Sequence, residues 1–159
     1  MRALGLWPMT RLAVLAPLIV RVIVGIIMAA HGLQKLTQMG PANFGGQLLA
    51  GLGVPLPVFF GYVVTFTELI GGILLIVGLL SRLAALALTI DLVVALLLVK
   101  VNVGLIAPQG SGAGAELDLA LIAGFLVILL GGPGRLSLDY LLGIEEDVED
   151  RPSTRRALG

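Results

Sequence analysis

Four long apolar segments constrain the fold of this chain more than any other feature of its sequence. They cover residues 12–36, 58–80, 83–103 and 117–130. A helix rises about 1.5 Å per residue and needs roughly 20 apolar residues to cross a bilayer, so the first three segments are long enough. The fourth is shorter, and we expect Glu116 and Asp118 to lie at its start near one membrane interface. The pattern predicts an all-α membrane protein with four transmembrane helices in a compact bundle.

The composition agrees with this class and excludes several kinds of function. Hydrophobic residues make up 58% of the chain and charged residues 13%, whereas soluble domains carry about 25% charged residues. Membrane lipids are therefore the first partners expected, and the formal net charge of zero gives no reason to expect nucleic acid. The absence of cysteine excludes disulfides and iron–sulfur clusters on this chain, and a single histidine cannot ligate a haem from both sides.

The connections between the apolar segments predict two short helices and one tight hairpin. Residues 37–57 are rich in Gly and Pro, and four apolar residues recur there at helical spacing: Phe44, Leu48, Leu49 and Leu52. We expect a short interfacial helix in this first outer loop. The connection around Ser81 has almost no turn residues, which favours a tight hairpin, and Ser137 or Asp139 is expected to begin a short helix after the fourth segment.

The distribution of charge predicts the domain boundaries and the orientation of the chain. Residues 1–142 form the expected transmembrane domain, and residues 143–159 form a charged tail that we expect to be flexible. With four helices, both termini and the second connection lie on one side, which holds these arginines: Arg2, Arg11, Arg82, Arg135, Arg151, Arg155 and Arg156. The other side has only Lys35 and Lys100, near helix ends. Basic residues favour the cytoplasmic side, so we predict a multi-pass plasma-membrane protein with both termini cytoplasmic.

Ionisable residues inside the apolar segments are costly in hydrocarbon, and such groups normally face the interior of a bundle and pair there. In the first segment, one stripe is formed at alternating spacings of four and three by Arg21, Gly25, Met28, Gly32 and Lys35. In the second segment, Glu68 lies on a similar stripe with Gly71 and Gly72. Glycine allows two helix backbones to approach closely, so we expect Glu68 to face the first helix across this contact.

Depth along the helices divides these residues into two clusters. Arg21 and Asp91 fall in the inner half, and we predict that they form a structural ion pair within the membrane. The outer cluster consists of His31, Lys35, Lys100, Glu116 and Asp118, with Glu68 below it. We expect Glu116 or Asp118 to pair with one of the three basic residues of this cluster.

The outer cluster has two interpretations that the residues alone leave open. In the first, its charges only fix which helices are neighbours, as buried polar groups do in other proteins. In the second, these six residues bind a ligand or relay protons, with His31 as a hydrogen-bond donor to a quinone carbonyl. A metal site built from His31 and the three carboxylates is disfavoured by the nearby Lys35 and Lys100.

Five stretches follow one another along the chain and, taken together, point to a family. They are HGLQKL, LGVPLP, ELIGGILLIVGLLSRLAAL, AELDLAL and GGPGRLSLD. Their order and spacing resemble the DoxX family of small bacterial membrane proteins, and the resemblance covers residues 21–140. It implies a four-helix domain in the bacterial inner membrane and an association with redox biology. Some relatives are subunits of a thiosulfate:quinone oxidoreductase, and others associate with a superoxide dismutase and a sulfurtransferase.

The resemblance therefore implies a membrane subunit of a redox-associated complex, with a quinone bound in the outer cluster. The family offers no agreed catalytic residues, and the absence of cysteine argues against sulfur chemistry on this subunit, so we do not expect it to be catalytic alone. The implied partners are a dismutase, a sulfurtransferase or a quinone oxidoreductase subunit. The alternative is a non-enzymatic membrane binder or carrier, or an assembly protein whose buried charges only specify helix packing.

Overall fold

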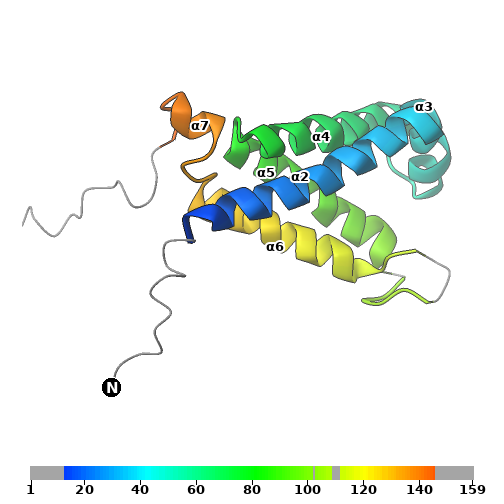
Figure 1. The fold of residues 1–159 in the computed structure, drawn as a ribbon. Coiled ribbons are helices and arrows are strands. Elements are labelled where there is room, and N and C mark those ends of the chain that lie inside the picture. The colour runs from blue at the N-terminus through cyan, green and yellow to red at the C-terminus, as the bar shows by residue number, and fades with distance from the viewer. Residues whose placement is uncertain (1–12, 102, 109–111, 146–159) are drawn as a thin grey trace, which may run out of the picture.

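A computed structural model describes residues 13–101, 103–108 and 112–145, and the regular elements of this part of the chain are all helical (Figure 1). In chain order they are η1 (Ala13–Leu15), α2 (Ala16–Gln34), η2 (Lys35–Met39), α3 (Pro41–Asn43), η3 (Phe44–Leu49), α4 (Pro57–Val77), α5 (Ser81–Ala95), η4 (Leu96–Lys100), α6 (Ala115–Gly131) and α7 (Leu138–Leu141). The segments η2, η3 and η4 are π-helical.

Three helical stretches are long and apolar enough to cross a membrane: Ala16–Met39, Pro57–Val77 and Ser81–Lys100. The prediction of an all-α membrane protein is therefore confirmed for the described residues. The helix α6 has 17 residues and is shorter than these three stretches, so the count of four membrane-spanning helices stays a prediction. Most of the predicted charged tail, residues 146–159, lies outside the described residues.

The helices α2 and α4 are held together by a contact between backbones, which the glycine stripes predict. A Cβ atom on Gly72 would lie 2.7 Å from the carbonyl oxygen of Gly25 and 2.9 Å from the Cα atom of Ala29. A Cβ atom on Gly32 would lie 2.7 Å from the Cα atom of Leu69. Neither position has room for a larger side chain, and this close approach gives α2 and α4 the most extensive contact in the fold.

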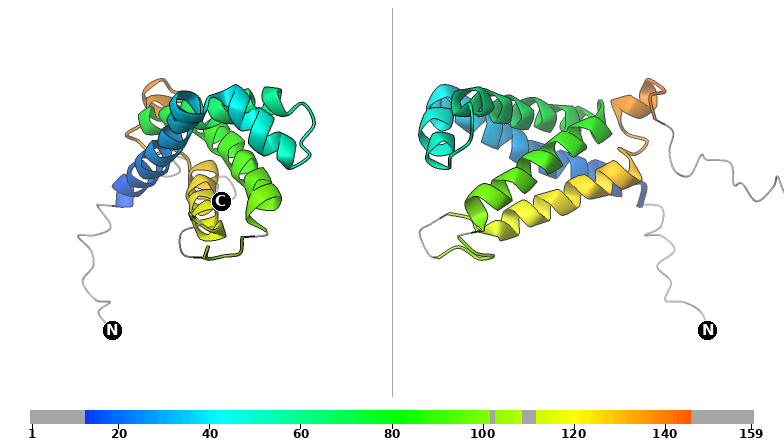
Figure 2. Two further views of the ribbon diagram at one scale, coloured as in Figure 1. Left: turned by 90° about the vertical axis from the view of Figure 1, so that its right-hand side faces the viewer. Right: turned by 180° about the vertical axis from the view of Figure 1, so that it is seen from behind.

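The helices α4 and α5 form the tight hairpin that the sequence predicts. Gly78 ends α4 in the left-handed region with φ 73°, and its N–H donates to the carbonyl oxygen of Leu74 at 2.8 Å. From this hairpin, α5 runs diagonally away from α4 toward the beginning of α6 (Figure 2). The core between the helices contains fully buried side chains from α2, α4, α5 and α6: Met28, Leu75, Leu88, Phe125 and Ile128.

The first long connection folds back beside α4 as the helical segment α3–η3. A Cβ atom on Gly61 of α4 would lie 2.8 Å from the Cα atom of Gly45, so the two backbones again touch through glycine. Phe44 and Leu49 of this segment are buried. A helical segment therefore forms where the sequence predicts one, and its position at a membrane interface stays a prediction.

Arg21 does not form the predicted ion pair with Asp91. Its guanidinium is buried, and Nη1 donates to the carbonyl oxygens of Leu75 at 3.0 Å and Ile76 at 2.9 Å, while Nη2 donates to that of Leu136. The positions of the two residues along their helices explain why the predicted pair does not form. Arg21 lies five residues into α2, about 7.5 Å from the end where the hairpin lies, whereas Asp91 lies ten residues into α5, about 15 Å from that end. The carboxyl end of α4 supplies carbonyl oxygens that attract the cation instead.

Asp139 and Ser137 complete this end of the bundle, which we call the hairpin end. The buried carboxylate of Asp139 accepts hydrogen bonds from the backbone N–H of Leu80 at 2.7 Å and of Ser81 at 2.8 Å, where α5 begins. Ser137 caps α7 by accepting a hydrogen bond from the N–H of Tyr140 at 3.2 Å. The prediction that Ser137 or Asp139 begins a short helix is confirmed. We call the opposite end of the bundle the loop end.

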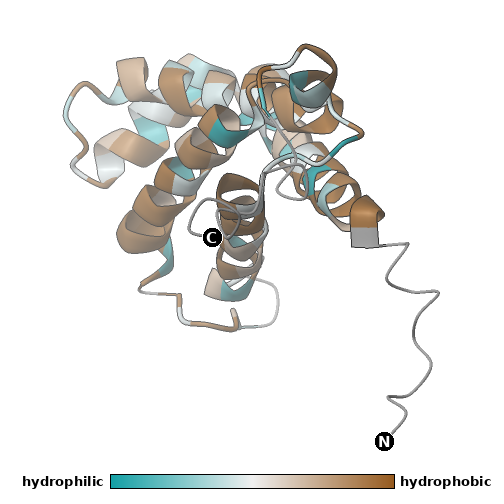
Figure 3. Cartoon of the chain, turned by 90° about the vertical axis from the view of Figure 1, so that its left-hand side faces the viewer, coloured by the Kyte–Doolittle hydropathy of each residue, from teal (hydrophilic) through white to brown (hydrophobic). Residues whose placement is uncertain are grey.

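Hydrophobic residues occur along much of the length of the helices (Figure 3). Large hydrophobic residues stand exposed on each of the three candidate spans, for example Ile23 at 54%, Ile70 at 52% and Ile90 at 56%. A soluble monomer rarely exposes a contiguous apolar surface of this kind, whereas a bilayer accommodates it. The surface therefore agrees with a location in the membrane.

The glycine contact leads to a stability prediction. In Gly32→Ala, the added methyl group meets the backbone of Leu69, which cannot move aside as a flexible side chain would. We expect the free energy of unfolding to fall by about 1–3 kcal/mol, measured by thermal unfolding of the purified protein in detergent. Gly51→Ala adds the same group where no atom lies within 4 Å, and it should leave stability unchanged or slightly higher. Equal stability of the two variants would contradict the close contact.

Candidate functional site

A cavity of about 340 Å³ lies at the loop end of the bundle, between α2, η2, η3, α4, α5, η4 and α6. Its wall is mainly apolar, with Met28, Phe44 and Leu92 among the lining residues. Six ionisable residues also line it: His31, Lys35, Glu68, Asp91, Lys100 and Asp118. We call this space the loop-end cavity. It brings together five of the six candidates predicted for the outer cluster, leaves out Glu116, and adds Asp91.

The ion pair between Lys35 and Glu68 crosses the contact between α2 and α4. Lys35 Nζ lies 2.5 Å from Glu68 Oε2, and the two side chains are only 14% and 7% exposed. Lys35 begins η2 at the end of α2, and a helical side chain leans back toward the N-terminus of its helix, which brings the ammonium group toward Glu68. The same ammonium group lies 5.3 Å from the centre of the Phe44 ring, within range of a cation–π interaction.

Asp118 contributes a buried carboxylate oxygen without a hydrogen-bond partner to the described wall of the cavity. It lies in the first turn of α6, is 9% exposed, and has a buried Oδ2 atom without a hydrogen-bond partner. A buried acceptor without a donor costs about 1–3 kcal/mol, and more when it carries charge. The fold therefore keeps an unsatisfied carboxylate in the wall of a cavity that is large enough for a small molecule.

Asp91 also lines the cavity, although the depth argument places it with Arg21. It is half-buried, and within the described part of the chain it has neither a hydrogen bond nor an ion pair. Treating the helices as parallel rods hides this position, because α5 crosses the bundle diagonally (Figure 2). The residue spacing gives a usable signal: Asp91, Ala95 and Leu98 recur at helical intervals and all line the cavity.

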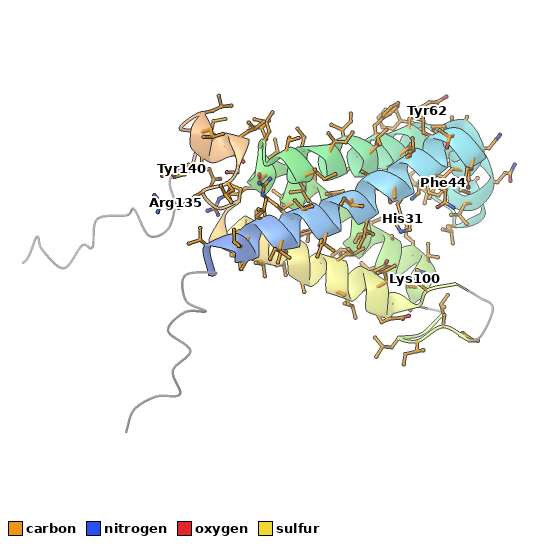
Figure 4. The ribbon with its side chains drawn as sticks, in the orientation of Figure 1. His31, Phe44, Tyr62, Lys100, Arg135 and Tyr140 are labelled. Carbon is orange, nitrogen blue, oxygen red and sulfur yellow. The ribbon has the colours of Figure 1, made fainter. Side chains whose placement is uncertain are left out.

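The ion pairing that the sequence predicts for the outer cluster does not form at Glu116, Lys100 or His31. Lys100 Nζ donates to the carbonyl oxygen of Ala113, and Glu116 accepts at 3.1 Å from the N–H of Gly114, so each has a backbone partner in the connection before α6. Across the described residues, neither Glu116 nor Asp118 forms an ion pair with a basic residue of the cluster. His31 lines the cavity but is exposed, and it lies near Phe44 and Lys100 at the loop end (Figure 4).

The π-helical segments η2, η3 and η4 all contribute to the wall of the cavity. Lys35 comes from η2, Phe44 and Leu49 from η3, and Lys100 from η4. Turns of this kind are rare and occur frequently at functional sites, because the extra residue per turn re-aims side chains. Their grouping around one cavity is an observation that the sequence does not predict.

In the part of the chain that the structure describes, the arrangement of the His, Asp and Glu side chains can be compared with that of a metal site. There, no group of three or more His, Asp or Glu side chains is arranged to hold a metal ion. The ammonium groups of Lys35 and Lys100 lie in the same wall as the carboxylates. The arrangement instead suits an uncharged molecule with an apolar body and a small number of polar atoms.

The amino-acid sequence matches the DoxX family model over residues 16–101, which is more than half of the chain. The chain belongs to the DoxX family. The matched region of this DoxX protein runs from the start of α2 to just beyond η4, so it contains Lys35, Glu68 and Asp91 and leaves out Asp118.

Two relatives are similar over most of this DoxX chain. The "Uncharacterized membrane protein Rv3486" of Mycobacterium tuberculosis is 34% identical over 133 residues, which cover 77% of this chain and 78% of that protein. The "Putative oxidoreductase CatD" of Bacillus subtilis is 34% identical over 123 residues, which cover 77% of this chain and 83% of that protein. No solved structure matches the chain. The two relatives support the family and the membrane location.

The buried ion pair leads to a prediction about coupling. In Glu68→Gln the ammonium group of Lys35 stays buried without its carboxylate, so we expect a loss of about 3–5 kcal/mol in the free energy of unfolding. The double variant Lys35→Met with Glu68→Gln leaves no charge of this pair to bury and should be more stable than either single variant, Lys35→Met or Glu68→Gln. Unfolding in detergent measures the coupling between the two sites.

The control for this cycle is His31→Gln, because His31 is exposed at the same end of the bundle. It should change the free energy of unfolding by no more than about 0.5 kcal/mol. Additive effects of the two single substitutions at residues 35 and 68 would show that the pair contributes nothing beyond its separate side chains.

Proposed function

We propose that this DoxX protein is a membrane subunit of a redox-associated complex and that it binds a quinone-type molecule in the loop-end cavity. The observation that carries the proposal is the wall of this cavity, in which apolar side chains surround the Lys35–Glu68 pair and Asp118. Its volume of about 340 Å³ falls in the range of small-molecule sites. A quinone ring is flat and apolar with an oxygen at each of two edges, so it needs apolar walls and few polar groups.

The loop-end cavity also borders the apolar outer surface, which suits a ligand dissolved in the membrane. Leu48 of η3 and Val94 of α5 both line the cavity, and they are 43% and 47% exposed. Leu98 of η4 lines it too and is 37% exposed. In this proposal a lipophilic ligand enters from the hydrocarbon between η3 and α5, without crossing water.

The redox part of the proposal draws on the relatives. One relative carries the name "Putative oxidoreductase CatD", which supports an association with electron transfer. The chain itself has no cysteine, so we propose that a partner protein exchanges electrons with the bound molecule. By family resemblance, the partner would be a dismutase, a sulfurtransferase or a quinone oxidoreductase subunit. The DoxX chain would then bind and position the ligand without being catalytic alone.

The proposed topology has four spans in the bacterial inner membrane. The 17 residues of α6 reach the lower end of the range of about 17–25 residues for a spanning helix, so we include α6 as the fourth span. The described ends of the chain, residues 13 and 145, lie at the hairpin end with Arg82 and Arg135 (Figures 1 and 4). The positive-inside rule places this end in the cytoplasm and η3 near the outer interface.

The test of ligand binding uses a filled cavity and a matched control. Ala95 is half-buried and lines the cavity, so Ala95→Phe places a ring in the ligand space. Ala123 is exposed on α6 and lies outside the lining, so Ala123→Phe adds the same ring elsewhere. We expect a short-chain quinone, offered in both redox states to the protein in nanodiscs, to bind the wild type and the control equally. The cavity variant should bind about tenfold more weakly or not at all.

Two results would contradict the proposed function. The first is that neither redox state binds the wild-type protein, which favours an assembly protein whose buried charges only specify packing. The second is equal binding by both phenylalanine variants, which places the ligand outside the loop-end cavity.

A further inference from the structure

The polar groups of the loop-end cavity are unequal in how well they are satisfied. Both ammonium groups have acceptors, because Lys35 donates to Glu68 and Lys100 donates to the carbonyl oxygen of Ala113. Asp118 Oδ2, by contrast, is buried without a donor. Asp91 has no hydrogen bond within the described part of the chain. Among the groups of the wall that are not exposed, the missing partners are therefore hydrogen-bond donors.

The numbers of acidic and basic groups in the wall also indicate an excess of hydrogen-bond acceptors. Three carboxyl groups, from Glu68, Asp91 and Asp118, share the wall with two ammonium groups, from Lys35 and Lys100, and with the exposed imidazole of His31. The carboxyl groups therefore outnumber the ammonium groups. Asp118 is the more deeply buried of the two that have no ion pair, at 9% exposed. A hydrogen bond from a ligand O–H group would therefore offset the largest burial cost at Asp118.

A quinone and its reduced form, the hydroquinone, differ in the hydrogen-bond donors that they offer. A quinone presents two carbonyl oxygens, which only accept hydrogen bonds, so one of them beside Asp118 would leave two acceptors facing each other. A hydroquinone presents two phenolic O–H groups, each of which can donate. A hydrogen bond from O–H to a carboxylate is short and about twice as strong as a bond between neutral groups. A wall with an unpaired acceptor would therefore favour the hydroquinone over a quinone of almost the same size and shape.

We propose that the loop-end cavity selects the reduced, hydroquinone form of its ligand, with Asp118 accepting a hydrogen bond from a phenolic O–H group. This inference rests on the proposed function, because it assumes a quinone-type ligand. It assigns to Asp118 the role of a specificity-determining residue. A site built to bond a hydroxyl group rejects the analogue that lacks it, because the protein group is then left unpaired.

The test compares three ligands that share one ring: a hydroquinone, its quinone, and the dimethyl ether of the hydroquinone, which has no O–H donor. Binding is measured without oxygen on the full chain in nanodiscs. The wild type should bind the hydroquinone about tenfold more tightly than either of the other two, as expected when a buried acceptor is left unpaired. The dimethyl ether separates the effect of the donor from that of ring electronics.

Two substitutions of one chemical kind complete the test. Asp118→Asn keeps the shape of the side chain and adds an N–H donor, so it should weaken hydroquinone binding and remove the preference over the quinone. Glu116→Gln makes the same chemical change two residues earlier on α6, at an exposed position outside the cavity lining, and it should keep the preference. Unfolding of each variant in detergent checks that both are folded.

The outcomes separate this inference from the proposed function. If the quinone or the dimethyl ether binds the wild type as tightly as the hydroquinone, the donor preference is wrong while the ligand site stands. The same holds if Asp118→Asn is folded and retains the preference. If none of the three ligands binds the wild type, the proposed function fails together with the inference.

Discussion

The contact between the backbones of α2 and α4 sets the positions of the other polar groups at the loop end. Gly25 and Gly72 allow the two helices to approach until no side chain fits between them. This approach brings Lys35 and Glu68 within 2.5 Å, in a place where neither charge is well hydrated. Burying two charges is costly, and close pairing recovers part of that cost. The ion pair is therefore a consequence of glycine packing, and it fixes a polar feature in an otherwise apolar wall.

The loop-end cavity arises because the other helices do not follow this close packing. The helix α5 leaves α4 at the hairpin and crosses to α6, while η3 covers the side of α4 (Figure 2). The space between them is lined by π-helical turns and by three carboxylates, and the buried Oδ2 atom of Asp118 has no partner. At the other end, every carboxylate oxygen of Asp139 has a backbone donor. The fold thus satisfies both carboxylate oxygens of Asp139 and leaves Asp118 Oδ2 without a partner.

The sequence predicts the helices, the glycine contact and most of the ionisable residues of the cavity, and physical reasons explain where it fails. Periodicity and depth place Glu68 against the first helix and gather His31, Lys35, Lys100 and Asp118 at one end. A pairing based only on depth matches Arg21 wrongly with Asp91. That reasoning assumes parallel helices and leaves out backbone carbonyl oxygens as acceptors. The same kind of acceptor satisfies Lys100, and a backbone N–H satisfies Glu116. The π-helical turns depend on tertiary packing and have no signal in the spacing of apolar residues.

Photoaffinity labelling tests most directly whether the loop-end cavity binds the proposed ligand. A photoreactive hydroquinone would be bound to the protein in lipid nanodiscs, irradiated, and located by mass spectrometry. We predict adducts on residues that line the cavity and are nearly inaccessible from the lipid, namely Met28, Leu92 and Leu121, and their loss when unlabelled hydroquinone is added. Adducts confined to exposed residues such as Ile23 and Ile70, and unaffected by the competitor, would contradict the account.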